Sequence, residues 1–301
     1  MSTKTELTVG DRKVTVSNLQ KVLYPAVGFT KGDVIDYYIR IAPVLLAHLE
    51  GRPLTLKRYP EGVAGFFFYE KQCPKHRPDW IETATVQSRR KEGQIDYCLM
   101  NNLPALVWVA NLADLELHTF LHRAPKHDRP TFLAFDLDPG APADIRQCCQ
   151  VGLWLKTLFD GWDLQAFPKT SGSKGLQIYV PLNTATTYEK TKPFAQAIAQ
   201  RLEREHPELV VSKQLKSLRG GKVLVDWSQN DEHKTTVCVY SLRAKEEPTA
   251  STPVTWEEVK KCAAGKAELR FHCRETLRRV EKLGDLFAPV LTLKQKLPNL
   301  R

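Results

Sequence analysis

The segment Phe132-Leu-Ala-Phe-Asp-Leu-Asp-Pro-Gly140 constrains the fold of this chain more than any other. Its apolar run predicts a buried strand that ends at Pro-Gly. Because side chains alternate along a strand, Asp136 and Asp138 point to the same face. Two carboxylates held that close repel each other and raise each other's pKa unless a cation lies between them. The pair therefore predicts a divalent-metal site, which indicates phosphate chemistry.

The composition is that of an ordinary folded protein with excess positive charge. The 301 residues are 42% hydrophobic and 26% charged, enough for one large core or two smaller ones. We recognise no signal peptide and no apolar run near the roughly 20 residues that span a bilayer, so we expect a cytoplasmic protein without a membrane partner. The formal net charge of +10 indicates an anionic polymer as partner.

Seven cysteines are present, an odd number without paired Cys-x-x-Cys spacing. This pattern argues against a disulfide framework and against a structural zinc site. The segment Cys73-Pro-Lys-His76 is the nearest to a metal-binding pattern, but without a second pair at finger spacing it is better interpreted as a loop.

Helical and strand patterns are mixed along the chain without strict alternation. Apolar spacing predicts helices at about 30–49, 103–112, 142–159 and 188–205, and a mostly helical tail from 256. Short β-rich runs predict strands at about 54–58, 65–71, 83–88, 95–98, 115–118, 132–138, 164–167, 176–180, 222–227 and 235–240. Residues 15–25 are turn-rich, 168–175 form a predicted loop and 244–253 a predicted linker. The pattern predicts an α+β fold with a mostly antiparallel or mixed sheet.

A third acid, Asp226, ends another short β-branched run. With Asp136 and Asp138 it could complete a three-carboxylate cluster that holds two hard cations. One cation would lower the pKa of an attacking hydroxyl, and the other would stabilise a leaving pyrophosphate. A single aspartate at a strand end is commonly a turn former or helix cap, so only the set of three indicates catalysis.

The loop Thr170-Ser-Gly-Ser-Lys-Gly175 lies between two predicted strands. Its small residues let backbone N–H groups approach a phosphate, the hydroxyls of Ser171 and Ser173 can donate, and Lys174 adds positive charge. The spacing is not that of a Walker loop. A plain hairpin turn is the alternative interpretation of this loop.

Seven segments in chain order resemble the polymerase domain of bacterial ligase D, which belongs to the archaeo-eukaryotic primase superfamily and works in non-homologous end joining. They are Asn18-Leu-Gln-Lys-Val-Leu-Tyr-Pro25, Pro53-Leu-Thr-Leu-Lys-Arg-Tyr-Pro60, Asp136-Leu-Asp-Pro-Gly140, Ser171-Gly-Ser-Lys-Gly-Leu176, Val225-Asp-Trp-Ser-Gln-Asn230, Tyr240-Ser-Leu-Arg243 and Leu283-Gly-Asp-Leu-Phe-Ala-Pro289. The resemblance extends from about residue 15 to 298. It implies an α+β, primase-type catalytic core with mixed or antiparallel sheets flanked by helices. It also implies one domain over 1–301, with a DNA-binding part at about 1–110, a catalytic core at about 111–245 and a helical part at about 254–301.

The same resemblance implies a metal-dependent nucleotidyltransferase, a polymerase-primase that extends or fills gaps at DNA ends and prefers ribonucleotides. Asp136, Asp138 and Asp226 would bind two Mn²⁺ or Mg²⁺ ions for in-line attack of a primer 3′-hydroxyl on the NTP α-phosphate. Lys21 and Lys31 would bind the 5′-phosphate at a gap. The implied nucleotide-pocket residues are Lys57, Phe68, Tyr69, His118, Ser171, Lys174, Gln177, Arg219, Gln229 and Arg243.

Gln177 departs from the family pattern, because the Ser-Gly-x-Lys-Gly-Leu motif there continues with a histidine that contacts the triphosphate. Glutamine can donate a hydrogen bond but cannot become cationic. We therefore expect phosphate affinity, pH dependence or nucleotide preference to differ from the family norm. The resemblance also implies that Phe68 and Tyr69 stand where the family places a stacking pair. Alternation predicts that at least one of Phe66, Phe67 and Phe68 is buried.

The implied partners are DNA ends, gaps and primer-templates with a 5′-phosphate, together with NTP or dNTP, which suits a nucleoid-associated location. No Lys-x-Asp-Gly ligase motif occurs, so we expect no ligase or nuclease domain and a Ku-like protein and a DNA ligase acting in trans. Two alternatives stay open. A non-catalytic DNA-end-binding module would explain the charge but not three acids facing a phosphate backbone. An Asp-x-Asp glycosyltransferase would explain the first motif but not Asp226 or the basic charge.

Overall fold

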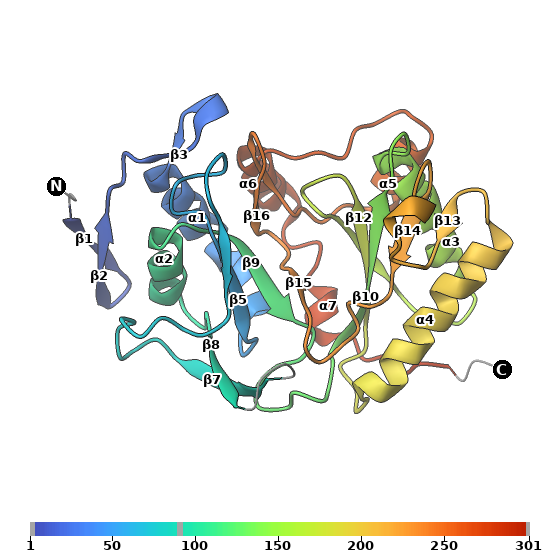
Figure 1. Cartoon of the computed structure of the whole chain (residues 1–301), viewed down its shortest axis with the longest axis horizontal. Coiled ribbons are helices and arrows are strands. Elements are labelled where there is room, and N and C mark those ends of the chain that lie inside the picture. Colours follow the sequence, from blue (N-terminus) through green and yellow to red (C-terminus); the bar gives the residue numbers. More distant parts are fainter. Residues whose placement is uncertain (1–3, 89–92, 299–301) are drawn as a thin grey trace. The chain divides into compact units, whose positions relative to one another are not determined.

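The computed structural model describes residues 4–88 and 93–298 and divides the chain into two compact units (Figure 1). Unit 1 comprises Met1–Pro125, Thr235–Ser251 and Phe271–Gly284, and unit 2 comprises Lys126–Lys234, Thr252–Arg270 and Asp285–Arg301. Each unit collects segments that are far apart in the sequence, so the division does not follow the three consecutive parts that the resemblance implies. Among the described residues, no helix is long and apolar enough to cross a membrane.

The described part of unit 1 contains a six-stranded sheet of order β15-β9-β5-β8-β7, with β6 paired to β5. These strands are β5 (Leu54–Arg58), β6 (Phe68–Glu70), β7 (Thr83–Gln87), β8 (Gln94–Cys98), β9 (Asp114–Phe120) and β15 (Thr235–Val237). Three hairpins accompany them: β1 (Lys4–Val9) with β2 (Arg12–Ser17), β3 (Val22–Tyr24) with β4 (Phe29–Thr30), and β16 (Leu242–Ala244) with β17 (Pro248–Ala250). The helices are α1 (Lys31–Leu49), α2 (Leu103–Asn111) and α6 (Cys273–Leu283).

Helix α1 shows how local sequence and packing agree. Thr30 caps it: its hydroxyl accepts a hydrogen bond from the Asp33 amide, and the Asp33 carboxylate accepts one from the Thr30 amide. Apolar residues at helical spacing, such as Ile41 and Leu45, are fully buried. Tyr38 donates from its hydroxyl to the Leu115 carbonyl at 2.8 Å, which joins the helix to β9.

Unit 2 contains a five-stranded sheet of order β11-β12-β10-β14-β13 in its described part. The strands are β10 (Phe132–Pro139), β11 (Phe167–Thr170), β12 (Leu176–Pro181), β13 (Val210–Val211) and β14 (Val223–Asp226), and only β13 and β14 pair in parallel. The helices are α3 (Ile145–Asp160), α4 (Tyr188–Glu205), α5 (Trp256–Ala263) and α7 (Pro289–Thr292).

Helix α3 covers one face of the unit 2 sheet. A Cβ added at Gly152 would lie 3.0 Å from Leu176 and 3.8 Å from Leu137, so the helix packs closely on this face. Phe159 on α3 contacts Phe135 with ring centres 5.7 Å apart. Since odd-numbered residues of β10 face α3, the even-numbered aspartates lie on the opposite face.

Three local expectations are wrong. The predicted linker at 244–253 takes in Ala244 of β16, the turn and all of β17, which pair as a hairpin, and its residues Thr249 and Ala250 are almost inaccessible. The strand predicted at 164–167 begins only at Phe167 and takes in residues 168–170, expected to be loop, because this segment pairs with β12. Phe66, Phe67 and Phe68 are all at least partly exposed, the first two by 71% and 45%, because regular pairing in β6 begins only at Phe68.

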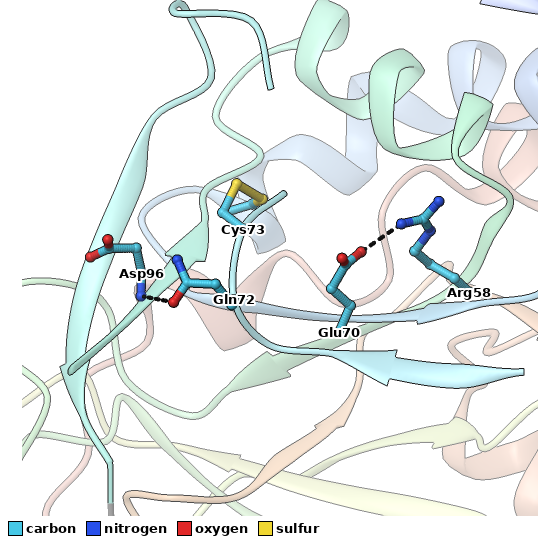
Figure 2. Close-up of a disulfide and its surroundings, with 6 residues drawn as sticks. Arg58, Glu70, Gln72, Cys73 and Asp96 are labelled. Carbon is cyan, nitrogen blue, oxygen red and sulfur yellow. Dashed lines mark hydrogen bonds and ion pairs between the residues drawn. A yellow bond between two sulfur atoms is a disulfide. The ribbon is translucent and has the colours of Figure 1, made fainter. Parts of the chain in front are cut away.

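A disulfide between Cys73 and Cys98 joins the loop after β6 to the end of β8 (Figure 2). Next to it, the Cys73 amide donates to the Asp96 carbonyl at 2.6 Å, and the Asp96 amide donates to Gln72 Oε1 at 3.2 Å. The sequence argued against a disulfide framework because sequence spacing does not show which cysteines a sheet brings together. The bridge occupies the Cys73 sulfur, which agrees with the interpretation of the Cys73–His76 segment as a loop.

We expect the double variant Cys73→Ala/Cys98→Ala to lose about 3 kcal/mol of unfolding free energy, because the bridge closes a loop across 25 residues of the unfolded chain. Urea unfolding with and without a phosphine reductant measures this loss. The reductant should weaken the wild type and leave the double variant unchanged. A wild type insensitive to the reductant would show that the bridge does not stabilise the fold.

Candidate active site

The central strand pair of unit 2 places Asp136 directly opposite Asp226. The two residues are partners in the antiparallel register of β10 and β14. Asp138, two residues along β10, shares the face of Asp136. Asp226 is only 8% exposed, and Asp136 and Asp138 are half-buried. The structure therefore brings the three predicted acids together on one face of the sheet.

The pKa of Asp136 departs from the ordinary value for an aspartate. Burial, followed by the negative charges of Asp138 and Asp226, raises the pKa of Asp136 to about 7, although a hydrogen bond from Gln177 and the charge of Lys169 act in the opposite direction. Its Oδ1 atom is buried and has no hydrogen-bond partner within the described chain. A buried carboxylate oxygen without a donor indicates a place for a cation.

Asp226 is held by donors instead. Gln214 Nε2 donates to its two oxygens at 3.0 and 3.1 Å, Ser228 donates from its amide and hydroxyl at 2.8 and 2.6 Å, and Gln229 Nε2 donates at 3.3 Å. The predicted Gln229 thus contacts an acid of the site. Gln214 is a partner that the sequence did not reveal, because it lies twelve residues away in an irregular segment.

These carboxylates fit a hard divalent cation. In residues 4–88 and 93–298, no three His, Cys, Asp or Glu side chains form a group that could hold a metal ion by themselves. Mg²⁺ in phosphate-transfer sites is commonly bound by one or two carboxylates together with substrate phosphates. The unpartnered Oδ1 of Asp136 and the neighbouring Asp138 are suited to such a shared site.

The Ser171–Gly175 turn between β11 and β12 lies against the aspartate strand. A Cβ added at Gly175 would lie 2.1 Å from the Leu137 carbonyl oxygen and 3.6 Å from Asp138 Oδ1, so only glycine allows this approach. The Ser171 hydroxyl accepts hydrogen bonds from the Ser173 and Gly175 amides at 3.2 and 3.1 Å and shapes the turn. Lys174 is exposed at its tip and directly precedes Gly175 in the chain.

Arg219 and Gln177 complete the unit 2 group. A Cβ added at Gly140 would lie 1.9 Å from the Arg219 carbonyl oxygen, so this glycine lets the Arg219 backbone lie against the end of β10. Arg219 Nη2 donates to the Gln214 carbonyl at 2.6 Å, while its buried Nε has no partner in the part of the chain that the structure describes. Gln177 is the register partner of Asp136 on β12.

In unit 1, the buried carboxylate of Glu116 gathers three of the predicted nucleotide-pocket residues. Its Oε2 lies 3.0 Å from His118 Nε2 and 3.3 Å from Lys57 Nζ, and its Oε1 lies 3.4 Å from Arg243 Nε. The Ala244 amide also donates to Oε1 at 3.1 Å. Glu116 was not predicted, although its place two residues before His118 on a strand was a usable signal, because such residues share a face.

The pKa values in this cluster follow from its charges. Burial acts to raise the pKa of Glu116, but the hydrogen bond with His118 and the charges of Arg243 and Lys57 outweigh it and hold that pKa well below the usual range. Burial lowers the pKa of His118, and the Glu116 contact opposes this effect only in part. One carboxylate faces three basic side chains, so the cluster favours an added anion.

Aromatic rings surround the Lys57 ammonium. Nζ lies 4.8 Å from the ring centre of Phe67, 5.3 Å from that of Tyr59 and 5.5 Å from that of Tyr69. The predicted Tyr69 is 56% exposed, with its ring edge-to-face to His118. Phe68 is half-buried under the Arg58 guanidinium, whose charge is paired with Glu70 (Figure 2).

The two predicted 5′-phosphate ligands differ in their surroundings. Lys21 is partly exposed, and its Nζ lies 3.1 Å from Glu61. Lys31, at the start of α1, is buried, and its Nζ donates to the Asn111 carbonyl at 2.9 Å. Burial, together with the charges of Lys21 and Arg58, lowers the pKa of Lys31 to about 8.

The fold and these two groups of residues define a class: α+β domains of the primase-polymerase type. Residues 30–287 match the family described as LigD, primase-polymerase domain, and the chain belongs to this family. The resemblance and the fold class expected from the sequence are thereby confirmed.

Relatives and a solved structure agree with this membership. The chain is 43% identical over 282 residues to the multifunctional non-homologous end joining protein LigD of Mycolicibacterium smegmatis, covering 92% of this chain and 36% of that protein. It is 34% identical over 248 residues to the bifunctional non-homologous end joining protein LigD of Bacillus subtilis, covering 82% of this chain and 39% of that protein. The structure of the polymerase domain of Mycobacterium tuberculosis ligase D in complex with DNA superposes with a TM-score of 0.88 at 40% identity, covering 95% of this chain and all of that one. The chain thus spans little more than a third of the LigD proteins and matches their polymerase domain.

We expect Asp136→Asn to stabilise the metal-free protein at pH 8 by on the order of 2 kcal/mol. Because the folded-state pKa of about 7 lies above the ordinary value of 3.8, wild-type stability falls as the pH rises from about 4 to 7 and stays low above it. The variant lacks this loss, and the two proteins should differ least near pH 4. Denaturant unfolding at both pH values measures the difference. A variant less stable than the wild type at pH 8 would contradict the charge repulsion inferred here.

We expect Glu116→Gln to lower the free energy of unfolding by about 3 kcal/mol, because it leaves buried cations without their shared carboxylate. The pKa of His118, followed by NMR, should fall further because the contact that raises it is lost. Glu61→Gln is the matched control: Glu61 is 66% exposed beside Lys21, and its loss should change stability by less than about 1 kcal/mol. Equal losses in the two variants would refute the central role of Glu116.

Proposed function

We propose that this chain is a metal-dependent nucleotidyltransferase that extends primers and fills gaps at DNA ends in non-homologous end joining. Membership of the LigD primase-polymerase family supports this activity. The observation that carries the proposal is the pairing of Asp136 with Asp226, with a buried Asp136 oxygen that lacks a hydrogen-bond donor in the described chain.

In this proposal Asp136, Asp138 and Asp226 bind two Mn²⁺ or Mg²⁺ ions. When bound, such ions favour ionisation of an attacking hydroxyl and offset the charge of a leaving pyrophosphate. The protein's own contribution is to hold the carboxylates in register across β10 and β14. The primer 3′-hydroxyl would attack the α-phosphate in line.

The incoming triphosphate would be held by fixed positive groups. Lys174 is exposed at the tip of the Ser171–Gly175 turn, and the buried Arg219 Nε lacks a partner in the described residues. Within unit 1 taken by itself, the Glu116 cluster of Lys57, His118 and Arg243 carries an excess of positive charge, which suits an anion. Ribonucleotides are the preferred substrate in this proposal, as the family resemblance implies.

DNA would be bound by the basic and aromatic residues of unit 1. Lys21 and Lys31 bind the downstream 5′-phosphate in the proposal, and the exposed ring of Tyr69 with its neighbour Phe68 supports a base. A solved relative at 40% identity is described in complex with DNA, which supports a DNA substrate. Such a substrate is in keeping with a cytoplasmic, nucleoid-associated location. A Ku-like protein and a DNA ligase would act in trans.

The test is extension on a gapped duplex, with or without a downstream 5′-phosphate, with NTPs or dNTPs and with Mn²⁺ or Mg²⁺. We expect extension by the wild type and a loss of roughly 100-fold or more in Asp138→Ala and Asp226→Ala. The ratio of activities with and without the 5′-phosphate should fall about tenfold in Lys31→Met, because a charged contact is lost. In the wild type this ratio should decline as the pH rises from 7 to 9, because Lys31 loses its proton near pH 8.

Lys13→Met is the matched control, since Lys13 is a 73% exposed lysine of the same unit. The 5′-phosphate ratio should be unchanged in this variant. Tight DNA binding without extension under either metal would favour the non-catalytic end-binding module, and sugar transfer from a nucleotide diphosphate would favour the glycosyltransferase. If the ratio of activities with and without the 5′-phosphate were unchanged in Lys31→Met, Lys31 would not bind the 5′-phosphate.

A further inference from the structure

Four polar side chains form one row across the unit 2 sheet. Lys169 on β11 is the register partner of Gln177 on β12, Gln177 is the partner of Asp136 on β10, and Asp136 is the partner of Asp226 on β14. Directly opposite residues on neighbouring antiparallel strands project to the same face. The two metal-binding acids therefore stand in line with an amide and a lysine.

Lys169 is fully buried, at 0% exposure, although lysine is rarely inaccessible unless its charge has partners. Residues 252–254 cover the outer edge of its strand: the Thr170 amide donates to the Thr252 carbonyl, and the Val254 amide donates to the Pro168 carbonyl. The Lys169 ammonium donates to Gln177 Oε1 and lies 5.3 Å from the ring centre of Tyr179.

The contact with Lys169 decides which way the Gln177 amide faces. A glutamine side chain has one oxygen that accepts and one NH₂ group that donates. With Oε1 accepting from Lys169, the NH₂ group is left for the other side, where Gln177 makes its hydrogen bond to Asp136. A carboxylate only accepts hydrogen bonds, so a flipped amide would turn its oxygen against Asp136 and repel it.

We propose that Lys169 is a positioning residue of the nucleotidyl-transfer site, which fixes the Gln177 amide so that its NH₂ group holds Asp136 in place. The inference rests on the proposed function, because the row matters for catalysis only if Asp136 binds the metal. Lys169 also supplies a buried positive charge in line with the acid pair. Lys169 and Gln177 thus act together to orient the Asp136 carboxylate.

Substitutions of Lys169 and Gln177 test this positioning role. Lys169→Met keeps the length of the side chain but removes its charge and donor, and Lys169→Arg restores both. We expect Lys169→Met to lower kcat by roughly 10- to 100-fold with little change in KM for the nucleotide, as for residues that orient a metal ligand, and Lys169→Arg to recover part of the loss. Lys156→Met, on an α3 lysine paired with Asp160, is the control and should leave kcat unchanged.

Two further variants keep the test decisive if Lys169→Met folds poorly. Gln177→Glu retains an acceptor for Lys169 but removes the NH₂ group, so it should fold and lose kcat by a similar factor. Lys169→Met/Gln177→Leu replaces the buried polar pair with apolar side chains. Its loss of kcat should be no greater than that of the worse single variant, because the two residues act through the same contact. Wild-type kcat in Gln177→Glu would overturn the proposal, as would multiplicative losses in the double variant.

A measurement without catalysis separates this inference from the proposed function. In the metal-free protein with ¹⁵N-labelled glutamine, the Gln177 NH₂ resonances should shift in both Asp136→Asn and Lys169→Met, because each change alters a partner of the amide. Resonances that respond to neither variant would refute the positioning role even if extension is observed. Shifts in both variants with no extension by the wild type would refute the proposed function while leaving the amide orientation established.

Discussion

The facing of Asp136 and Asp226 across β10 and β14 is the constraint on which unit 2 depends. Burial of Asp136, followed by the negative charges of Asp138 and Asp226, opposes its ionisation and raises its pKa to about 7. The strands are held in spite of this by the apolar opposite face, where Leu137 packs under α3. Burial of that face offsets the repulsion between the two carboxylates. A bound cation would relieve the repulsion that remains.

Unit 1 shows the opposite charge balance. Glu116 is one buried carboxylate among Lys57, His118 and Arg243, so positive charge exceeds negative charge in its cluster, whereas Asp136, Asp138 and Asp226 are three acids on one face of the unit 2 sheet. Nucleotidyl transfer needs both kinds of site: acids for the metal ions and cations for phosphates.

Polar groups inside a sheet are tolerated only when nearly all of them are satisfied. Asp226 accepts hydrogen bonds from Gln214, Ser228 and Gln229, and Gln177 is held by Lys169. The exceptions are informative, because Asp136 Oδ1 and Arg219 Nε are buried without partners in the described chain. Unsatisfied groups of opposite charge are suited to a metal ion and to a phosphate, respectively.

The sequence by itself determined the α+β class, most helices and the aspartate strand, because these follow from local apolar periodicity and from the Pro-Gly that ends the strand. It also determined the family, through short motifs in fixed order. Only the tertiary structure decided which distant residues meet: Glu116 with its three cations, Gln214 with Asp226, Cys73 with Cys98, and Lys169 with Gln177. Strand register and the covering of sheet edges create these contacts. Both depend on hydrogen bonds between segments far apart in the chain, which no local pattern encodes.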